Sequence, residues 1–184
     1  CGKYGRDILD AYEQTGEIAP KLLRRFGISD GNRQTLLLGM FMSQLVNPYK
    51  WRVYSNFYTS NGPEGEIIVD YVKKEWEKEP HVGETPLQII KEVVQHGKTA
   101  VESIEKAAPN VKTNKEEFSR LKNDIHCYQA LANFFAEKVN AALLVSRYRY
   151  SKDISDLDKA VPFLEKSIEY YEQVVELTRE SYLY

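Results

Sequence analysis

The sequence lacks the features that mark disulfide-bonded, membrane-spanning and nucleic-acid-binding proteins. It holds two cysteines, Cys1 and Cys127, which cannot form a disulfide framework. No apolar run approaches the roughly 18 residues that span a bilayer. Lys and Arg number 25 against 27 Asp and Glu, which gives a net charge of −2 and no excess of positive charge for phosphates. We therefore expect a chain that is soluble as given, with no transmembrane segment and no nucleic-acid partner.

Motifs of catalysis and metal binding are missing as well. The three histidines are scattered: His81 in a loop, His96 within a helical pattern and His126 beside Cys127, whose side chain points about 100° away on a helix. There is no glycine-rich phosphate loop and no Gly-x-Ser-x-Gly elbow. The many carboxylates alternate with lysines, as on solvated helix faces. We expect no catalytic residue, no metal site and no cofactor in this chain.

What the sequence does contain is the apolar spacing of α-helices. The longest series lies in 114–150, where the steps alternate between three and four residues: Phe118, Leu121, Ile125, Tyr128, Ala132, Phe135, Val139 and Ala142. Such spacing places a continuous apolar stripe on one face of an α-helix. Few residues favour strand pairing. The pattern predicts an all-α fold with this helix at its centre.

Further helices follow from the same kind of pattern. We predict helices over 4–14, 20–26, 36–46, 64–79 and 85–108, the last capped by the Thr85 hydroxyl and approached closely by another helix at Gly97. The residues expected to face inward include Leu9, Tyr12, Leu23 and Trp76. A last helix, starting at Ser155, carries a second three-four series of residues expected to face inward: Leu157, Val161, Leu164, Ile168, Tyr171 and Val175. Because the polar turn before it is short, the last two helices should form a long antiparallel hairpin. The sequence thus predicts one all-α domain over 1–184, a helical bundle of about six to seven helices.

One segment has an unusual mixture of aromatic and polar side chains. Its candidate contact residues are Trp51, Arg52, Tyr54, Asn56 and Tyr58, preceded in the chain by Asn32 and Arg33. Aromatic rings stack on the C–H face of a sugar, while amide and guanidinium groups pair with its hydroxyls. Tyr, Trp and Arg also anchor protein interfaces, and rings of this kind pack in cores. Carbohydrate contact, an interface and core packing are therefore all open for this segment.

Three stretches carry a resemblance to a known class of enzyme. They are the run 5–13 (GRDILDAYE) followed by Ile18-Ala19-Pro20, the run 31–36 (GNRQTL) and the run 170–178 (YYEQVVELT). They resemble the helical region that follows the catalytic barrel in large, secreted, multidomain glycoside hydrolases of polysaccharide-degrading bacteria, of the alpha-glucuronidase or hexosaminidase type. The resemblance implies a periplasmic or extracellular protein, and a fragment of a larger chain.

These observations give one leading hypothesis and two alternatives. The leading one is a non-catalytic accessory domain of a carbohydrate-active enzyme, which packs against the catalytic domain or a sister subunit and borders the sugar site. The first alternative is a helical-hairpin interaction module or a lipoprotein anchored through Cys1. Helix-forming sequence begins near Tyr4, without the usual flexible tether, which favours a fragment over an anchor. The second alternative is a stand-alone helical enzyme, which needs convergent ionisable groups in one pocket.

Overall fold

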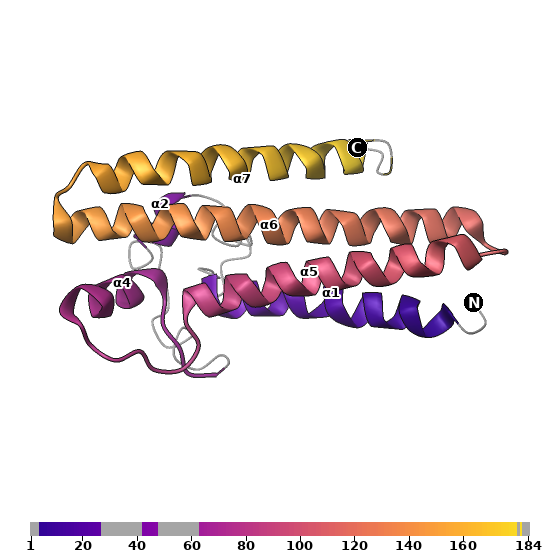
Figure 1. Ribbon diagram of the computed structural model, residues 1–184, viewed down its shortest axis with the longest axis horizontal. Helices are drawn as coiled ribbons and strands as arrows, with labels where there is room; N and C mark the ends of the chain where they lie inside the picture. The colour runs from indigo at the N-terminus through magenta and orange to yellow at the C-terminus, as the bar shows by residue number, and fades with distance from the viewer. Residues whose placement is uncertain (1–3, 27–41, 48–62, 180, 182–184) are drawn as a thin grey trace.

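The computed structural model describes residues 4–26, 42–47, 63–179 and 181, and this part of the chain is all-α (Figure 1). Its helices are α1 (Gly5–Phe26), α2 (Met42–Val46), α4 (Ile68–Glu77), α5 (Pro86–Ala107), α6 (Lys115–Ser151) and α7 (Ser155–Arg179), with a 3-10 turn, η4, at Ala108–Asn110. The predicted all-α class is confirmed for these residues. The predicted total of about six to seven helices depends also on residues outside these ranges and stays a prediction.

Helix α6 lies at the centre of the bundle. It packs against α7 on one side and against α5 on the other, and α1 lies against α5 (Figure 1). Helices α6 and α7 run in opposite directions, joined by residues 152–154, while α2 and α4 lie near the end of α6 that leads into α7. None of the helices in the described residues is long and apolar enough to cross a bilayer.

The range and most of the buried stripe of α6 agree with the sequence. Its two ends are set by residues in the left-handed conformation, Asn114 (φ 51°) and Lys152 (φ 54°). Of the predicted stripe, Ile125, Ala132, Phe135, Val139 and Ala142 are buried and Phe118 and Leu121 are partly buried. Tyr128 is an exception, because its side chain is 41% exposed.

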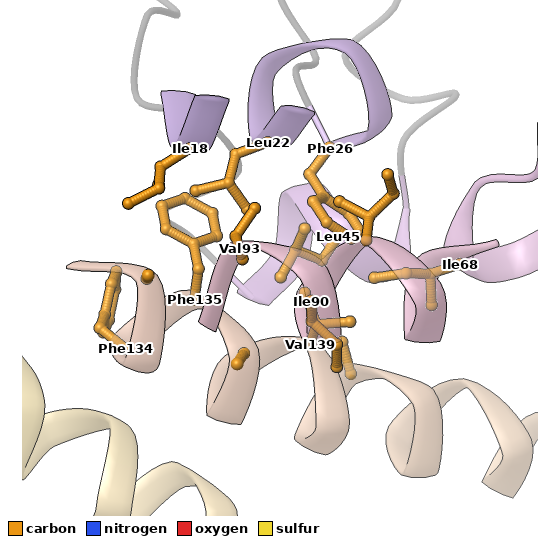
Figure 2. Close-up of a cluster of buried hydrophobic side chains, with 14 of the residues drawn as sticks. Ile18, Leu22, Phe26, Leu45, Ile68, Ile90, Val93, Phe134, Phe135 and Val139 are labelled. Carbon is orange, nitrogen blue, oxygen red and sulfur yellow. The ribbon is translucent and has the colours of Figure 1, made fainter. Parts of the chain in front are cut away.

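The main core lies where five helices meet (Figure 2). Phe135 and Val139 of α6 face α5, which contributes Ile90 and Val93. The side chains from α1, α2 and α4 are Ile18, Leu22, Phe26, Leu45, Val46, Ile68 and Val72. Helix α5 begins as predicted, since Thr85 Oγ1 accepts a hydrogen bond from the Gln88 N–H at 3.2 Å.

Gly97 allows α5 to approach α6 closely, as its place in the stripe of the predicted helix suggested. A Cβ at this position would lie 3.1 Å from the Gln129 Cα of α6. A smaller cluster of buried side chains continues the α1–α5–α6 contact beyond this point: Ala11, Ala100, Ile104 and Ile125. The long helices are therefore held together along most of their length.

The predicted break between two N-terminal helices is wrong, because α1 is continuous. The Thr15 hydroxyl donates to the Ala11 carbonyl oxygen at 3.0 Å, which keeps Thr15 within the helix. Pro20 removes only the helical hydrogen bond to the Gly16 carbonyl, and the buried series continues past it to Leu22. Three side chains expected to face inward are exposed instead: Leu9, Tyr12 and Leu23.

The predicted helix over 64–79 starts later, at Ile68. Residues 64–66 pair with the segment before α5: Glu66 N–H donates to Glu84 O at 2.8 Å, and Glu84 N–H donates to Glu64 O at 2.9 Å. This isolated bridge satisfies backbone groups that a helix would otherwise pair. Trp76, which was expected to face inward, is 48% exposed.

The prediction for the buried face of α7 is also wrong. The residues buried on this helix are Asp156, Ala160 and Ser167, whereas Val161, Ile168, Tyr171 and Val175 are exposed. The buried face follows a second three-four series, which lies one residue before the predicted one and therefore about 100° around the helix. Small side chains such as Ala160 and Ser167 let α7 lie close to α6, which explains the choice of face.

Candidate functional site

The seven contact residues proposed from the sequence lie outside the described residues. They are Asn32, Arg33, Trp51, Arg52, Tyr54, Asn56 and Tyr58. Their role in carbohydrate or interface contact stays a prediction, and the described structure directs attention to a different place. This place is the corner formed by α4, the loop 78–85 and the last turns of α6.

A buried carboxylate organises the loop after α4. Glu66 accepts hydrogen bonds from Lys74 Nζ at 2.7 Å and the Val82 N–H at 2.8 Å, and its second oxygen lies 2.6 Å from His81 Nδ1. Burial raises the pKa of Glu66, but the three hydrogen bonds together outweigh it and hold the pKa below its ordinary value. Glu66 is therefore ionised and ties the loop to α4.

His81 bridges two carboxylates. Its Nε2 lies 2.7 Å from Glu75 Oε1, opposite the contact to Glu66, and its ring stacks on Tyr71 with centroids 4.3 Å apart. The hydrogen bonds to Glu75 and Glu66 raise the pKa of His81, because both favour the charged imidazolium. This arrangement uses both ring nitrogens of His81, so it acts as a clamp between the loop and α4.

A second ionic cluster fixes the end of α1 to the same loop. Glu84 accepts from Arg24 through both its carboxylate oxygens and from Arg25 Nη2 at 2.8 Å. Burial raises the pKa of Glu84, and the hydrogen bonds from the two arginines outweigh it and lower the pKa. Gly65 makes room for this cluster, because a Cβ there would collide with the Arg25 guanidinium. The loop is thus anchored to α1 and to α4.

The anchored corner borders a cavity of about 550 Å³, here called the α4–α6 pocket. It is lined by Tyr71, Val72, Glu75, Trp76, Lys78, Leu87, Leu143, Leu144 and Arg147. Four aliphatic side chains supply apolar surface, and charged groups come from both helices. The indole of Trp76 stacks on Tyr150 of α6, with ring centroids 6.0 Å apart and planes 27° apart.

The chemistry of this pocket suits binding better than catalysis. Exposed aromatic faces and aliphatic surface bind rings, and Arg147, whose side chain is largely exposed, can donate to hydroxyl or carboxylate oxygens. Glu75 is engaged by His81. Within the described residues, no three His, Cys, Asp or Glu side chains come together as a metal site.

A buried cation lies elsewhere on α6, at Lys138. Its side chain is only 9% exposed, and its ammonium group lies 5.0 Å from the centre of the Phe134 ring. Burial lowers the pKa of Lys138 to about 8. The sequence could have predicted this burial, because Lys138 lies four residues after Phe134 and four before Ala142. Residues four apart lie on the same face of a helix, so Lys138 shares the face of two buried residues.

Sequence patterns do not predict the residues of the α4–α6 pocket. Trp76 was assigned to the core and His81 to a loop without partners, because the bridge between Gly65 and Glu84 that folds this loop back has no sequence signature. The available signal in the sequence was the presence of two carboxylates close to His81: Glu75 precedes His81 by six residues, and Glu66 precedes Glu75 by nine.

Comparison with known proteins relates this all-α chain to an enzyme class. No protein-family model and no curated protein matches it. Among solved structures, it is similar to one part of a glycoside hydrolase. That protein is a GH138 enzyme targeting pectin rhamnogalacturonan II, with 54% sequence identity and a TM-score of 0.94. The match covers 99% of this chain and 21% of the GH138 enzyme, so the chain spans about one fifth of the enzyme that it matches.

The expected relation to a glycoside hydrolase is confirmed by this comparison. The narrower expectation of an alpha-glucuronidase or hexosaminidase type is not addressed by it and stays a prediction.

Proposed function

We propose that this chain is a non-catalytic helical region of a larger glycoside hydrolase. The observation that carries the proposal is the match to the GH138 enzyme over 99% of this chain and 21% of that enzyme. At 54% identity and a TM-score of 0.94 the two segments share a fold, and the other four fifths of such an enzyme are available to hold the reacting groups. This relation favours an accessory region over a stand-alone interaction module.

The ionic clusters support a structural role for this region. Glu66 and Glu84 bind cations and backbone groups of their own chain, and His81 uses both ring nitrogens to join two carboxylates. Groups held in this way fix the loop between α4 and α5. The stand-alone helical enzyme, by contrast, requires ionisable groups that converge on a substrate.

The test compares hydrolysis by two proteins on rhamnogalacturonan II oligosaccharides, with detection of the released sugars. One is the complete gene product and the other is the chain 1–184. The proposal predicts turnover by the complete gene product and none by the chain alone. Two results would contradict it: hydrolysis by the chain that is lost when one carboxylate is replaced, or a complete gene product without glycoside hydrolase activity.

A second proposal concerns the α4–α6 pocket, which in this account contributes to carbohydrate contact at the border of the enzyme's sugar site. It is favoured by the exposed Trp76, stacked on Tyr150, with Arg147 lining the same cavity. A pyranose ring can stack on the indole while the guanidinium binds its oxygens. Rhamnogalacturonan II, the target of the GH138 enzyme, is the polysaccharide to test first.

The pocket is tested with the complete gene product carrying Trp76→Ala. Loss of a stacking surface away from the reacting bond should raise KM severalfold and leave kcat unchanged. The matched control is Tyr128→Ala, which removes another exposed aromatic about six turns before Tyr150 on α6. Equal KM values for wild type and Trp76→Ala would exclude a carbohydrate contact at this pocket.

A further inference from the structure

The outer face of α7 carries a regular row of exposed apolar side chains. Positions seven residues apart hold Ile154, just before the helix, and Val161, Ile168 and Val175, which are 61%, 49%, 58% and 42% exposed. Leu157 and Leu164, which are partly buried, lie between them at the spacing of a second core position, whereas Tyr171 at the next such position packs against Phe134 of α6, with ring centroids 5.2 Å apart. This is the apolar heptad pattern of a helix that packs along another surface. We call Ile154, Leu157, Val161, Leu164, Ile168 and Val175 the outer stripe of α7.

Helix α7 therefore has one face that packs on α6 and one apolar face that the described residues leave exposed. Its inner face, with Ala160 and Ser167, packs on α6, and Figure 1 shows α7 at the edge of the bundle beside α6. An edge helix with one partner normally turns polar residues outward. A contiguous exposed apolar row on such a helix marks an interaction surface.

The charges beside the outer stripe define the partner. Asp158, Glu165 and Glu172 form an acidic row along one edge, which Arg179 ends, and within the described part of the chain no ion pair neutralises these three carboxylates. Two copies of α7 packed through their stripes would bring acidic rows near each other, which is unfavourable. The complementary partner is a surface with an apolar centre and with Lys or Arg along its edge.

We propose that the outer stripe of α7 docks onto the remainder of the enzyme chain, against an apolar surface edged with basic residues. This inference rests on the proposed function, because the partner is the part of a larger glycoside hydrolase that this chain does not contain. The comparison is consistent with such a partner, since the match covers only 21% of the GH138 enzyme. The docking holds the helical region in a fixed orientation on the enzyme.

The test measures thiol accessibility at two positions of α7 in the complete gene product. Ile168→Cys places a thiol in the outer stripe, and Gln173→Cys places one at an exposed position five residues on, about 140° around the helix. Each variant is treated with N-ethylmaleimide, and the labelled α7 peptide is followed by mass spectrometry, which separates it from native cysteines. We expect Gln173→Cys to react at least tenfold faster than Ile168→Cys.

Charge complementarity is tested in the Ile168→Cys background. Adding Glu165→Lys and Glu172→Lys should bring the labelling rate up toward that of Gln173→Cys, because the new lysines face the partner's basic edge. The pair Lys159→Glu and Lys166→Glu, which lies about 100° beyond the acidic row and away from the outer stripe, is the control and should leave the rate unchanged. If the labelling rate of Ile168→Cys is unchanged by Glu165→Lys and Glu172→Lys, the proposed basic residues at the edge of the partner surface are excluded.

The outcomes separate this inference from the proposed function. Equal labelling of Ile168→Cys and Gln173→Cys in a gene product that hydrolyses its polysaccharide overturns the docking and leaves the function standing. Protection of Ile168→Cys that disappears on dilution, together with a doubled mass in sedimentation, assigns the stripe to a second copy and overturns the chosen partner. A gene product without hydrolase activity overturns the proposed function, and with it the enzyme chain as partner.

Discussion

The contact between α5 and α6 predicts opposite effects for two glycine-to-alanine substitutions. Gly97 lies in α5 where that helix crosses α6, and an added Cβ would be 3.1 Å from the Gln129 Cα and 3.4 Å from the Gln129 Cγ. Gly16 lies inside α1, and a Cβ there would meet no heavy atom within 4 Å. Both sites are helical, so their gain in helix propensity is the same and only the surroundings differ.

The expected magnitudes follow from that difference. Replacing Gly by Ala inside a helix stabilises it by about 1 kcal/mol. At Gly16 nothing opposes this gain, so Gly16→Ala should raise the free energy of unfolding by about 1 kcal/mol. At Gly97 the nearest atom belongs to the backbone of a packed helix, and overpacking of this kind costs about 1–3 kcal/mol. Gly97→Ala should therefore destabilise by up to about 2 kcal/mol.

Urea denaturation followed by far-UV circular dichroism measures both variants against the wild type. The urea concentration at the midpoint should rise for Gly16→Ala and fall for Gly97→Ala. The slope of the free energy of unfolding against urea concentration should be the same for both variants and the wild type. A midpoint that rises equally for both variants would refute the reasoning, since it would mean that α5 and α6 are not in close contact at Gly97.

Three further predictions concern the core and the ionic clusters. Phe135→Ala should lower the free energy of unfolding by about 3–5 kcal/mol, because Phe135 is buried where α6 meets α5; a loss below about 1 kcal/mol in thermal melts would exclude this packing. Lys138→Met should stabilise at pH 7 by up to about 3 kcal/mol, since burial lowers the pKa of Lys138 from 10.5 to about 8 and each unit corresponds to about 1.4 kcal/mol. That gain should shrink as pH rises from 8 to 10.5, where the folded wild type loses the proton first; a gain independent of pH would contradict it. The His81 clamp should stabilise the fold most between pH 4.5 and 6.5. The pKa of His81 is raised, so its contribution to stability is lost as pH rises through the folded-state pKa; the pKa of Glu66 is lowered, so the contribution of Glu66 is lost as pH falls through its folded-state pKa. The melting temperatures of His81→Phe and wild type should therefore differ least at high pH.

The sequence predicts those parts of the fold that a single helix determines. The series from Phe118 to Ala142 gives the range of α6 and most of its buried face, because one long uninterrupted stripe has one way to face a core. Thr85 predicts the start of α5 through its capping hydroxyl, and Gly97 predicts the close approach of another helix. These signals are local, and they are physical properties of α-helices.

Features that depend on how two helices or segments pack together cannot be predicted from the apolar pattern of one helix. Helix α7 carries two three-four series one residue apart, and only the shape of α6 selects Ala160 and Ser167 for the buried face. The choice of Val161 and Ile168 followed hydrophobicity, whereas close packing favoured small side chains. The loop after α4 is held by backbone pairing of Gly65 with Glu84, and the Trp76 ring stacks on Tyr150 of α6. Both contacts join residues distant in sequence, so a local pattern does not predict them.

The central claim is that this chain supports a glycoside hydrolase without supplying a reacting group. The most direct measurement is kcat of the complete gene product carrying Glu75→Gln, which replaces the carboxylate lining the α4–α6 pocket and keeps an oxygen that can accept from His81. We expect a kcat within about twofold of wild type on rhamnogalacturonan II oligosaccharides. A kcat lowered by about a hundredfold or more, in a variant with unchanged thermal stability, would show that Glu75 takes part in the reaction and would contradict the claim.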